Sequence, residues 1–255
     1  MSNFVTSAQF QSLKNEILEN IRNFKTRGDV FIEGNRNVIR LFKIDNTLLN
    51  IKSFKNPNFI NKIVYRYFRK SKARRSFEYA SKLMNLGIGT PNPIAYYENF
   101  DFLGLRDSFY VCEHLEDVFE FRALVQRLDI ANRDEIIRQF IQFSFKMHES
   151  GVEFLDHSPG NTLIKNNNDG SYSFYLVDLN RMKFHEKMDF QSRMKNLSRL
   201  TPQKEMIVIM ASEYAKLSGE AEDVVFDAMW QFTSDFQFRF HRKKNIKKKL
   251  KFWKK

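Results

Sequence analysis

The chain has 255 residues, 42% of them hydrophobic, and a formal net charge of +12. This length supports one large domain or two lobes with a real core, and the composition is not that of a disordered chain. The single cysteine, Cys112, excludes an internal disulfide and a cysteine-based zinc site, and we see neither a leader-like start nor a run near the roughly 20 apolar residues of a membrane span, so we expect a soluble, cytoplasmic protein.

The first part of the chain is predicted to be rich in strands. Residues 7–25 favour a short helix, because apolar residues recur there at helical spacing. Three β-prone runs follow, separated by the turn signals GNRN and DN: DVFIEG, NVIRLFKID and TLLNIKSFK. Residues 58–86 favour two helical pieces that change direction near Ser71, and the second ends at LGIGTPNP. A hairpin whose second strand ends near Cys112 is predicted for IAYYENFDFLGLRDSFYVCEHLE.

The second part is predicted to be mostly helical. Residues 117–150 and 186–240 favour helices, and between them TLIK, NNNDGS and YSFYLVD predict a strand, an Asp-Gly turn and a strand. The order of elements indicates an α+β protein with two lobes. Its expected parts are an N-terminal helical extension (1–27), a β-rich N-lobe (28–113), an α-helical C-lobe (114–238) and a basic tail (239–255).

A polar, turn-prone loop, EFLDHSPGNTLI, precedes the first strand of the second hairpin. Pro159 and Gly160 predict a turn that aims Asp156 and Asn161 toward one point. Because an antiparallel hairpin returns its second end close to its first, we expect Asp178 to come back near Asn161. Two carboxylates and an amide oxygen are hard ligands that suit magnesium, and phosphoryl transfer uses such a cluster. Taken alone, the loop residues fit a plain surface turn equally well.

A kinase also needs a lysine on a strand of the other lobe, held by an acid from a helix. Lys52 lies in the apolar run LLNIKSFK, where a buried charge needs a partner. Glu78 is the only acid between residues 53 and 97, so we expect a Lys52–Glu78 pair. Separately, each residue has an ordinary reading: a surface lysine, and a helix glutamate that pairs with Arg74 or Arg75.

Four segments together resemble the bacterial lipopolysaccharide core kinases, the Kdo and heptose kinase family: FLDHSPGNTLI, YLVDLNRM, NIKSFK and FRKSKARRSFEYASKL. The resemblance covers roughly residues 28–240 and implies a two-lobed fold similar to that of protein kinases. It implies ATP as phosphate donor and a sugar hydroxyl of a membrane-embedded glycolipid as acceptor. In such kinases Asp156 would be the catalytic base, Asn161 and Asp178 would bind Mg²⁺, and Lys52 with Glu78 would hold the α- and β-phosphates.

The same resemblance places the adenine-binding hinge and the phosphate loop. Glu113 to Leu115 would lie at the hinge, where backbone groups could bind adenine, and Gly34 is the one glycine of the phosphate-covering turn EGNRN. This turn departs from the usual glycine-rich loop. Ser158 stands where protein kinases usually carry lysine, which argues against an ordinary protein kinase. Phe154 stands where kinases commonly carry a supporting histidine, so we expect weaker rather than absent catalysis.

The positive charge is concentrated at the end of the chain. Residues 239–255 hold ten Lys or Arg and no acid, which leaves a formal charge of +2 for the rest. Ile246, Leu250 and Trp253 fall on one helical face among lysines, a pattern typical of a helix at an anionic membrane interface. A second basic block at 61–76 suits the same partner. A frayed, solvated terminus is the plain alternative.

We therefore expect a lipopolysaccharide sugar kinase, peripheral to the inner membrane of a Gram-negative bacterium, with no nucleic-acid partner. The sequence does not specify the oligomeric state, the sugar or the hydroxyl. Two alternatives with the same fold stay open: a kinase of a soluble small molecule or protein, and a pseudokinase that binds nucleotide as a scaffold. A third is a basic nucleic-acid-binding protein, whose binding would fall steeply with salt and ignore magnesium and ATP.

Overall fold

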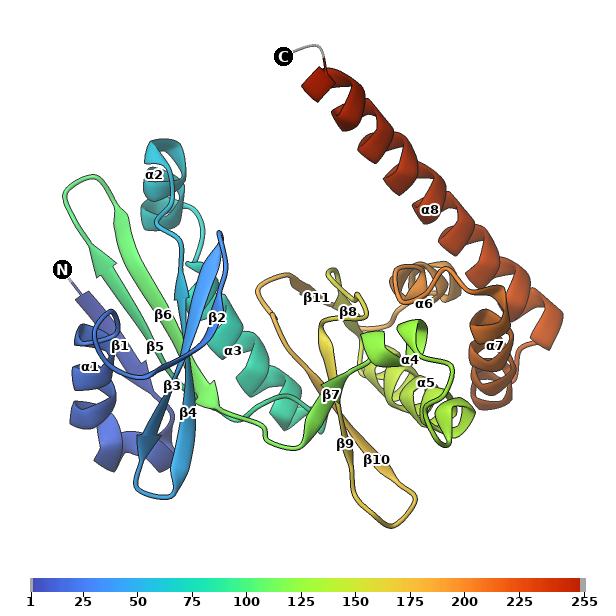
Figure 1. Ribbon diagram of the computed structural model, residues 1–255, viewed down its shortest axis with the longest axis horizontal. Coiled ribbons are helices and arrows are strands. Elements are labelled where there is room, and N and C mark those ends of the chain that lie inside the picture. Colours follow the sequence, from blue (N-terminus) through green and yellow to red (C-terminus); the bar gives the residue numbers. More distant parts are fainter. Residues whose placement is uncertain (1, 253–255) are drawn as a thin grey trace. The chain divides into compact units, whose positions relative to one another are not determined.

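The computed structural model describes residues 2–252, with the side chains of residues 249–252 left out of the description. It divides into two compact units, coloured along the chain in Figure 1. The N-terminal unit contains residues 1–116 and 176–181, and the C-terminal unit contains residues 117–175 and 182–255. Each unit is described by itself. The β-rich first part and the helical second part confirm the predicted fold class.

The N-terminal unit is built on an antiparallel six-stranded sheet in the order β1-β5-β6-β4-β3-β2. Its strands are β1 (Ser2–Thr6), β2 (Asp29–Glu33), β3 (Asn37–Ile44), β4 (Thr47–Phe54), β5 (Pro93–Phe100) and β6 (Leu105–Glu113). The last two form the hairpin predicted from the sequence. β4 lies between β3 and β6, so a side chain on this strand is held on both sides.

The first 27 residues belong to this unit rather than forming an extension. β1 pairs with β5, and the 3-10 helix η1 (Ala8–Leu13) and α1 (Lys14–Arg22) follow it. Their apolar side chains join the sheet core, which consists of Phe10, Ile17, Ile21, Phe24, Phe42, Ile44, Leu49, Ile51, Ile94, Ala95 and Val111. The sequence did not predict β1, because a five-residue strand is defined here by its distant partner and not by local periodicity.

Two helices separate β4 from β5, as the sequence predicted. α2 (Phe59–Tyr67) is capped by the side chain of Asn58 and α3 (Lys72–Asn85) by that of Ser71, which accepts from the amide of Arg74 at 3.1 Å. The Ser71 cap explains the change of direction, since an N-cap residue is extended and begins a new helix. α3 packs on β5 and β6 through buried residues such as Ala80 and Leu83, whereas α2 buries no residue.

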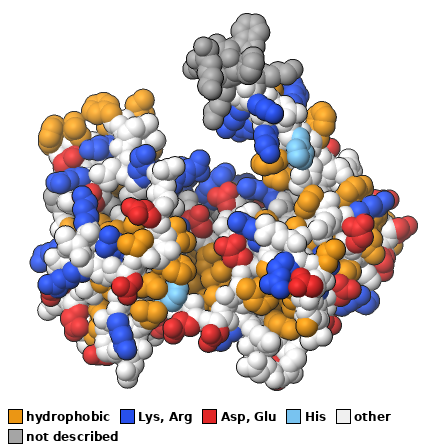
Figure 2. All heavy atoms as spheres, in the orientation of Figure 1, with side chains coloured by type: hydrophobic (Ala, Val, Ile, Leu, Met, Phe, Trp, Pro, Cys, Tyr) orange, Lys and Arg blue, Asp and Glu red, His pale blue; other side chains and the backbone are white. Residues whose placement is uncertain are grey.

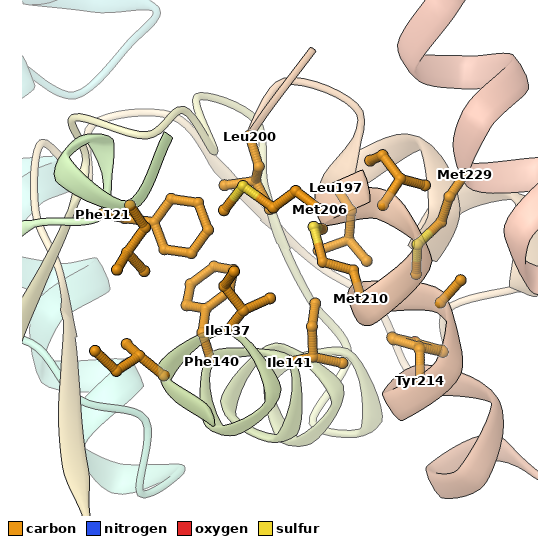
Figure 3. Close-up of a cluster of buried hydrophobic side chains, with 14 of the residues drawn as sticks. Phe121, Ile137, Phe140, Ile141, Leu197, Leu200, Met206, Met210, Tyr214 and Met229 are labelled. Carbon is orange, nitrogen blue, oxygen red and sulfur yellow. The ribbon is translucent and has the colours of Figure 1, made fainter. Parts of the chain in front are cut away.

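The C-terminal unit packs five helices around one apolar core (Figure 3). They are α4 (Arg122–Gln126), α5 (Arg133–Glu149), α6 (Phe190–Leu197), α7 (Lys204–Ser218) and α8 (Glu222–Phe252). The rings of Phe121 and Phe140 meet at 4.3 Å in this core. Short strands frame the loop at 155–161: β7 (Val118–Glu120), β8 (Val152–Phe154), β9 (Thr162–Asn166), β10 (Tyr172–Leu176) and β11 (Met182–Phe184). The predicted β9–β10 hairpin is present.

The final helix, α8, continues well past the core of its unit (Figure 1). Val225, Met229 and Thr233 are buried in its first half, but every residue from 238 to 248 is exposed. The sequence placed Leu250 and Trp253 on the amphipathic face. Trp253 and the side chain of Leu250 lie outside the described part of the chain. None of the helices described here has both the length and the apolar character required to cross a membrane.

Candidate active site

The N-terminal unit contains an ion pair between two of the predicted site residues, Lys52 and Asp178. Lys52 lies on the central strand β4, and its Nζ is 2.7 Å from Oδ1 of Asp178. The lysine side chain is 13% exposed, so its charge is paired in a largely buried position. The sequence indicated both residues, but it did not indicate that they pair with one another.

The segment 176–181 carries Asp178 into the N-terminal unit through three hydrogen bonds. The backbone amide of Leu176 donates to the Gly89 carbonyl at 2.9 Å. The backbone carbonyl of Leu176 accepts from the Thr90 hydroxyl at 2.9 Å. The Arg75 guanidinium donates to the Asn180 carbonyl at 2.6 Å. These bonds fix the backbone on both sides of Asp178.

Asp178 itself has the left-handed backbone conformation, with φ of 60°. This conformation is costly for a residue other than glycine, and it is concentrated at functional sites. Oδ1 accepts from Lys52 and from the Asn180 amide at 2.8 Å, and within the described residues Oδ2 accepts no hydrogen bond. The carboxylate is 37% exposed. A hard cation can therefore be bound through Oδ2 without breaking either contact.

The expected Lys52–Glu78 pair is contradicted. Glu78 accepts from Lys70 at 2.7 Å and from Arg74 at 2.9 Å, as the plain reading of a helix glutamate anticipated. Burial alone would raise the pKa of Glu78, but the hydrogen bonds from Lys70 and Arg74 hold it below its usual value. The physical reason is local: Arg74 stands one turn before Glu78 on α3, at the i, i+4 spacing that brings side chains together.

Lys72 is a site residue that the sequence reading missed. Its Nζ lies over the Phe54 ring at 6.0 Å, and the Nζ of Lys52 lies over the same ring at 5.4 Å. Burial lowers the pKa of Lys72, the charge of Asp178 opposes that shift, and Arg75 and Lys52 add to it. Several cations thus surround one carboxylate, an arrangement that favours an anion carrying more than one charge. The signal was hidden because Lys72 stands in a long basic run.

In the predicted phosphate turn and hinge, some backbone amides already donate hydrogen bonds to carbonyls of the N-terminal unit. The Gly34 amide donates to the Asn37 carbonyl at 3.0 Å, so this predicted cofactor contact is engaged in the turn. At the hinge, the Glu113 amide donates to the Asn92 carbonyl at 3.0 Å. The Leu115 amide donates no hydrogen bond within the described part of the chain, and of the two hinge residues it is the one with an available donor.

In the C-terminal unit, the predicted turn brings Asn161 to Asp156. The Asn161 side-chain amide donates to the Asp156 carbonyl at 2.8 Å, and its backbone amide donates to the Ser158 carbonyl at 2.9 Å. Because the Nδ2 end faces Asp156, the Oδ1 end faces away from it as an acceptor. That orientation fits a metal ligand, since the amide oxygen is the atom that would coordinate a cation.

Arg199 is the second residue that the sequence reading missed. Its Nη1 donates to the Leu155 carbonyl at 2.9 Å and lies 3.3 Å from Oδ1 of Asp156. Its guanidinium also lies over the ring of Phe236 on α8 at 5.5 Å. The ring and the carbonyl hold the arginine in place, and the arginine in turn restrains the Asp156 carboxylate.

A buried polar network lies beneath the loop at 155–161, and Phe154 is held in it through its backbone carbonyl. The side-chain amide of Asn196 donates to the Phe154 carbonyl at 2.8 Å, so its Oδ1 can only accept from the two histidines. That oxygen lies 3.3 Å from Nδ1 of His157 and 3.2 Å from Nε2 of His148, and Nδ1 of His148 meets the Tyr214 hydroxyl at 3.0 Å. Phe154 is fully buried beside His157, and both support the loop from below.

Burial determines the charge of both histidines. It lowers the pKa of His148 to about 3 and that of His157 to about 4, because a buried imidazolium loses its hydration. Both are therefore neutral near pH 7. Neither histidine has metal-ligand spacing in the sequence. The contacts with Asn196 join distant parts of the chain, so no local pattern indicated this network.

The predicted site residues thus form two groups. Lys52, Asp178, Glu78, Gly34 and the hinge belong to the N-terminal unit, and Asp156 and Asn161 belong to the C-terminal unit. Among the described residues, no group of three or more His, Cys, Asp or Glu could hold a metal ion.

Comparison with known proteins gives one family match and a set of similar structures. The structure of WaaP in complex with acyl carrier protein is similar at a TM-score of 0.65 and 15% identity, covering 94% of this chain and 98% of that one. MAP kinase LmaMPK10 from Leishmania major is similar at a TM-score of 0.46 and 15% identity, covering 78% and 59%. No curated protein matches the sequence.

The family match covers most of the chain and both groups of site residues. It spans residues 25–219, and its description is lipopolysaccharide kinase (Kdo/WaaP) family. The WaaP likeness shows a common fold across nearly the whole chain. The chain belongs to the lipopolysaccharide kinase (Kdo/WaaP) family.

Proposed function

We propose that the protein is an ATP- and Mg²⁺-dependent phosphotransferase that phosphorylates a sugar hydroxyl, of Kdo or heptose, in the lipopolysaccharide inner core. The family supports a lipopolysaccharide kinase. The observation that carries the finer proposal is the Lys52–Asp178 pair, because it joins a phosphate-binding cation to a metal-binding carboxylate.

The N-terminal unit is proposed to bind the nucleotide. The Leu115 amide would donate to the adenine, and Lys52 and Lys72 would bind phosphate oxygens over the Phe54 ring. Asp178 and Asn161 would hold Mg²⁺, which neutralises phosphate charge when bound. We no longer assign Glu78 to the phosphates, because Lys70 and Arg74 already engage it.

The C-terminal unit is proposed to activate the acceptor. The Asp156 carboxylate would accept the proton of the sugar hydroxyl and orient its oxygen for attack. Arg199 would keep that carboxylate in one orientation through its contact with Oδ1. Asn161, held by the Asp156 carbonyl, would link the base to the metal-binding group.

The acceptor's chemistry supports a location at the cytoplasmic face of the inner membrane of a Gram-negative bacterium. The exposed half of α8 carries the basic residues Arg242, Lys243, Lys244, Lys247 and Lys248 beside the exposed Phe238, Phe240 and Ile246. Such a helix suits an anionic lipid surface. The partner of WaaP in the similar structure is an acyl carrier protein, so a carrier protein is the second candidate partner for the basic surfaces.

The test is phosphate transfer from ATP to purified deep-rough lipopolysaccharide. We expect Asp156→Asn and Asp178→Asn each to lower turnover by at least about 10³-fold, because each removes a group on which the reaction depends. The matched control is Asp129→Asn, because the Asp129 side chain is exposed and pairs with Arg127 at the surface; it should retain wild-type turnover.

Three other outcomes would contradict part of this proposal. Wild-type turnover by both site variants would show that the site is misassigned. Transfer to a soluble sugar but not to lipopolysaccharide would indicate a soluble-substrate kinase. Binding of nucleic acid that ignores MgATP and falls steeply with salt would favour the non-enzymatic alternative.

A further inference from the structure

The exposed tip of the N-terminal unit carries large apolar side chains from two segments. On α2 and the residue after it, Phe59 is 59% exposed, Ile60 70%, Tyr67 67% and Phe68 82%, and in the β5–β6 turn Phe102 is 87% exposed. These five residues are termed the α2 patch. Figure 2 shows hydrophobic side chains gathered at the upper left, where Figure 1 places α2 and this turn.

The two segments of the α2 patch are fixed to one another. Arg66 donates to the Asp101 carbonyl at 2.7 Å and to the Phe102 carbonyl at 3.3 Å, and Lys62 pairs with Asp101 at 3.2 Å. Gly104 lies directly beneath the helix, where a Cβ would collide with the Lys62 carbonyl. The backbone of α2 is therefore seated closely on the turn, although the helix buries no side chain.

This arrangement does not serve the core. Ile60 and Tyr67 lie seven residues apart, which places them on nearly the same side of the helix, and Phe59 lies about a quarter turn around the helix from them. A polar outer face would be expected for a helix that only covers a turn. An apolar outer face on a fixed, projecting element is instead typical of an interaction site.

The charge around the α2 patch defines the kind of partner. Lys55, Arg69 and Lys70 are exposed in the same stretch of chain, where no acidic residue occurs between residues 46 and 77, although Lys70 is paired with Glu78. The sequence reading treated residues 61–76 as one basic surface. The structure divides that block: residues 66–70 are exposed, whereas Arg75 and Ser76 are buried on α3. The cations that remain outside lie next to exposed rings.

We propose that the α2 patch is a membrane-docking surface that inserts its rings and Ile60 into the interface of a bilayer containing anionic lipid. This inference rests on the proposed function, because a glycolipid acceptor requires the enzyme at a lipid surface. Aromatic side chains prefer the lipid–water interface, and neighbouring Lys and Arg are attracted to anionic headgroups. Two segments of the N-terminal unit supply this contact, so it is separate from α8.

The experiment measures partition of the full-length protein onto vesicles of phosphatidylcholine with about 30% phosphatidylglycerol. The test variant combines Ile60→Ser, Phe68→Ser and Phe102→Ser, the three most exposed residues of the patch. We expect its partition coefficient to fall by about tenfold or more, since interfacial binding scales with the apolar area inserted. The matched control combines Leu128→Ser, Val208→Ser and Leu217→Ser, exposed apolar residues of the C-terminal unit, and should bind as the wild type does.

A second variant isolates the charge. Arg69→Gln combined with Lys70→Gln should weaken binding to the anionic vesicles and leave binding to pure phosphatidylcholine vesicles unchanged. Equal partition of the wild type and the triple serine variant would overturn the proposal. So would an unchanged vesicle partition accompanied by lost binding of a small acidic protein, because the patch would then be a protein-docking surface.

The outcome can be separated from that of the proposed function. If the wild type transfers no phosphate to any lipopolysaccharide but the triple serine variant still loses vesicle binding, the docking surface stands and the acceptor assignment fails. If transfer is present and the serine variant matches the wild type on vesicles, the kinase assignment stands and the docking surface fails. Turnover on a deacylated, water-soluble acceptor should be equal in the two proteins.

Discussion

At the scale of single residues, the N-terminal unit concentrates cations around Asp178. Lys52 and Lys72 share the Phe54 ring, although they come from different elements, β4 and α3. Burial lowers the pKa of Lys72, and a bound anion would oppose that shift by offering the ammonium a favourable contact. Lys72 is therefore well placed to bind a polyphosphate in this unit.

We expect Lys72→Met to raise the KM for ATP by about tenfold and to change kcat less, because the ammonium binds phosphate in the ground state as well as in the transition state. Steady-state kinetics with varied ATP measures both values. Lys82→Met, an exposed position on the same helix, is the control. An unchanged KM in Lys72→Met would remove this residue from the nucleotide site.

Sequence reasoning indicated the candidate site residues that have local signals. Asp156, Asn161 and Asp178 were indicated because turn residues and strand ends mark their positions, and Lys52 because it interrupts an apolar strand. Glu78 was chosen because no other acid was nearby, and this argument ignored Lys70 and Arg74, which reach it first. Lys72 and Arg199 could not be found, since their roles depend on contacts between distant segments.

At the scale of elements, α8 has two different halves. Its first half is anchored by Val225, Met229 and Thr233, and Phe236 then lies under the guanidinium of Arg199. Beyond Phe238 no described side chain is buried. The helix thus connects a basic, exposed end to the arginine that contacts Asp156.

Two truncations separate these halves. Removing residues 243–255 should leave the free energy of unfolding within about 0.5 kcal/mol of the wild type, because only exposed side chains are lost from the described part of that segment. Removing residues 236–255 should in addition remove the Phe236 ring from the Arg199 guanidinium. We therefore expect this second truncation, unlike the first, to lower turnover on a water-soluble acceptor. Urea unfolding and turnover assays measure the two effects. Equal turnover after both truncations would show that Phe236 does not act on Arg199.

The sequence predicted the longer elements well and the short strands poorly. The β5–β6 and β9–β10 hairpins and the break at Ser71 follow from turn residues and a helix cap, which are local features. β1, β7, β8 and β11 were missed, because strands of three to five residues are stabilised by distant partners such as β5 for β1 and β9 for β7.

At the scale of the whole molecule, stability depends on keeping His148 and His157 neutral. Their pKa values in the folded protein are about 3 and about 4, whereas a histidine in the unfolded chain titrates near 6.5. Below about pH 6.5 the unfolded chain therefore binds protons that the folded chain does not. The resulting stability is present above pH 6.5 and is lost as the pH falls toward the folded values.

We expect the free energy of unfolding to decrease by about 3 kcal/mol between pH 6.5 and pH 5, from the two histidines together. Urea titrations at several pH values measure this slope. His148→Gln should roughly halve it, since glutamine does not titrate, and His241→Gln, at an exposed position on α8, should leave it unchanged. A slope that persists in full in His148→Gln would contradict the assignment.

The order of a β-rich part and a helical part was correct, but the expected domain boundaries were not those of the compact units. The N-terminal residues 1–27 contribute core side chains rather than an extension, and the first crossing to the C-terminal unit comes after Glu116. Composition and periodicity describe neighbours along the chain. They cannot show that residues 176–181 return to the first unit.

That return has a consequence for synthesis of the protein on the ribosome. Lys52 and its partner Asp178 are 126 positions apart, and the backbone of 176–181 is held by residues 75, 89 and 90. While the chain emerges from its N-terminal end, the sheet is complete once β6 has appeared, but Lys52 still lacks its carboxylate. The contact between Lys52 and Asp178 can form only after residues 117–175 have been translated, so the polar group around Lys52 matures late.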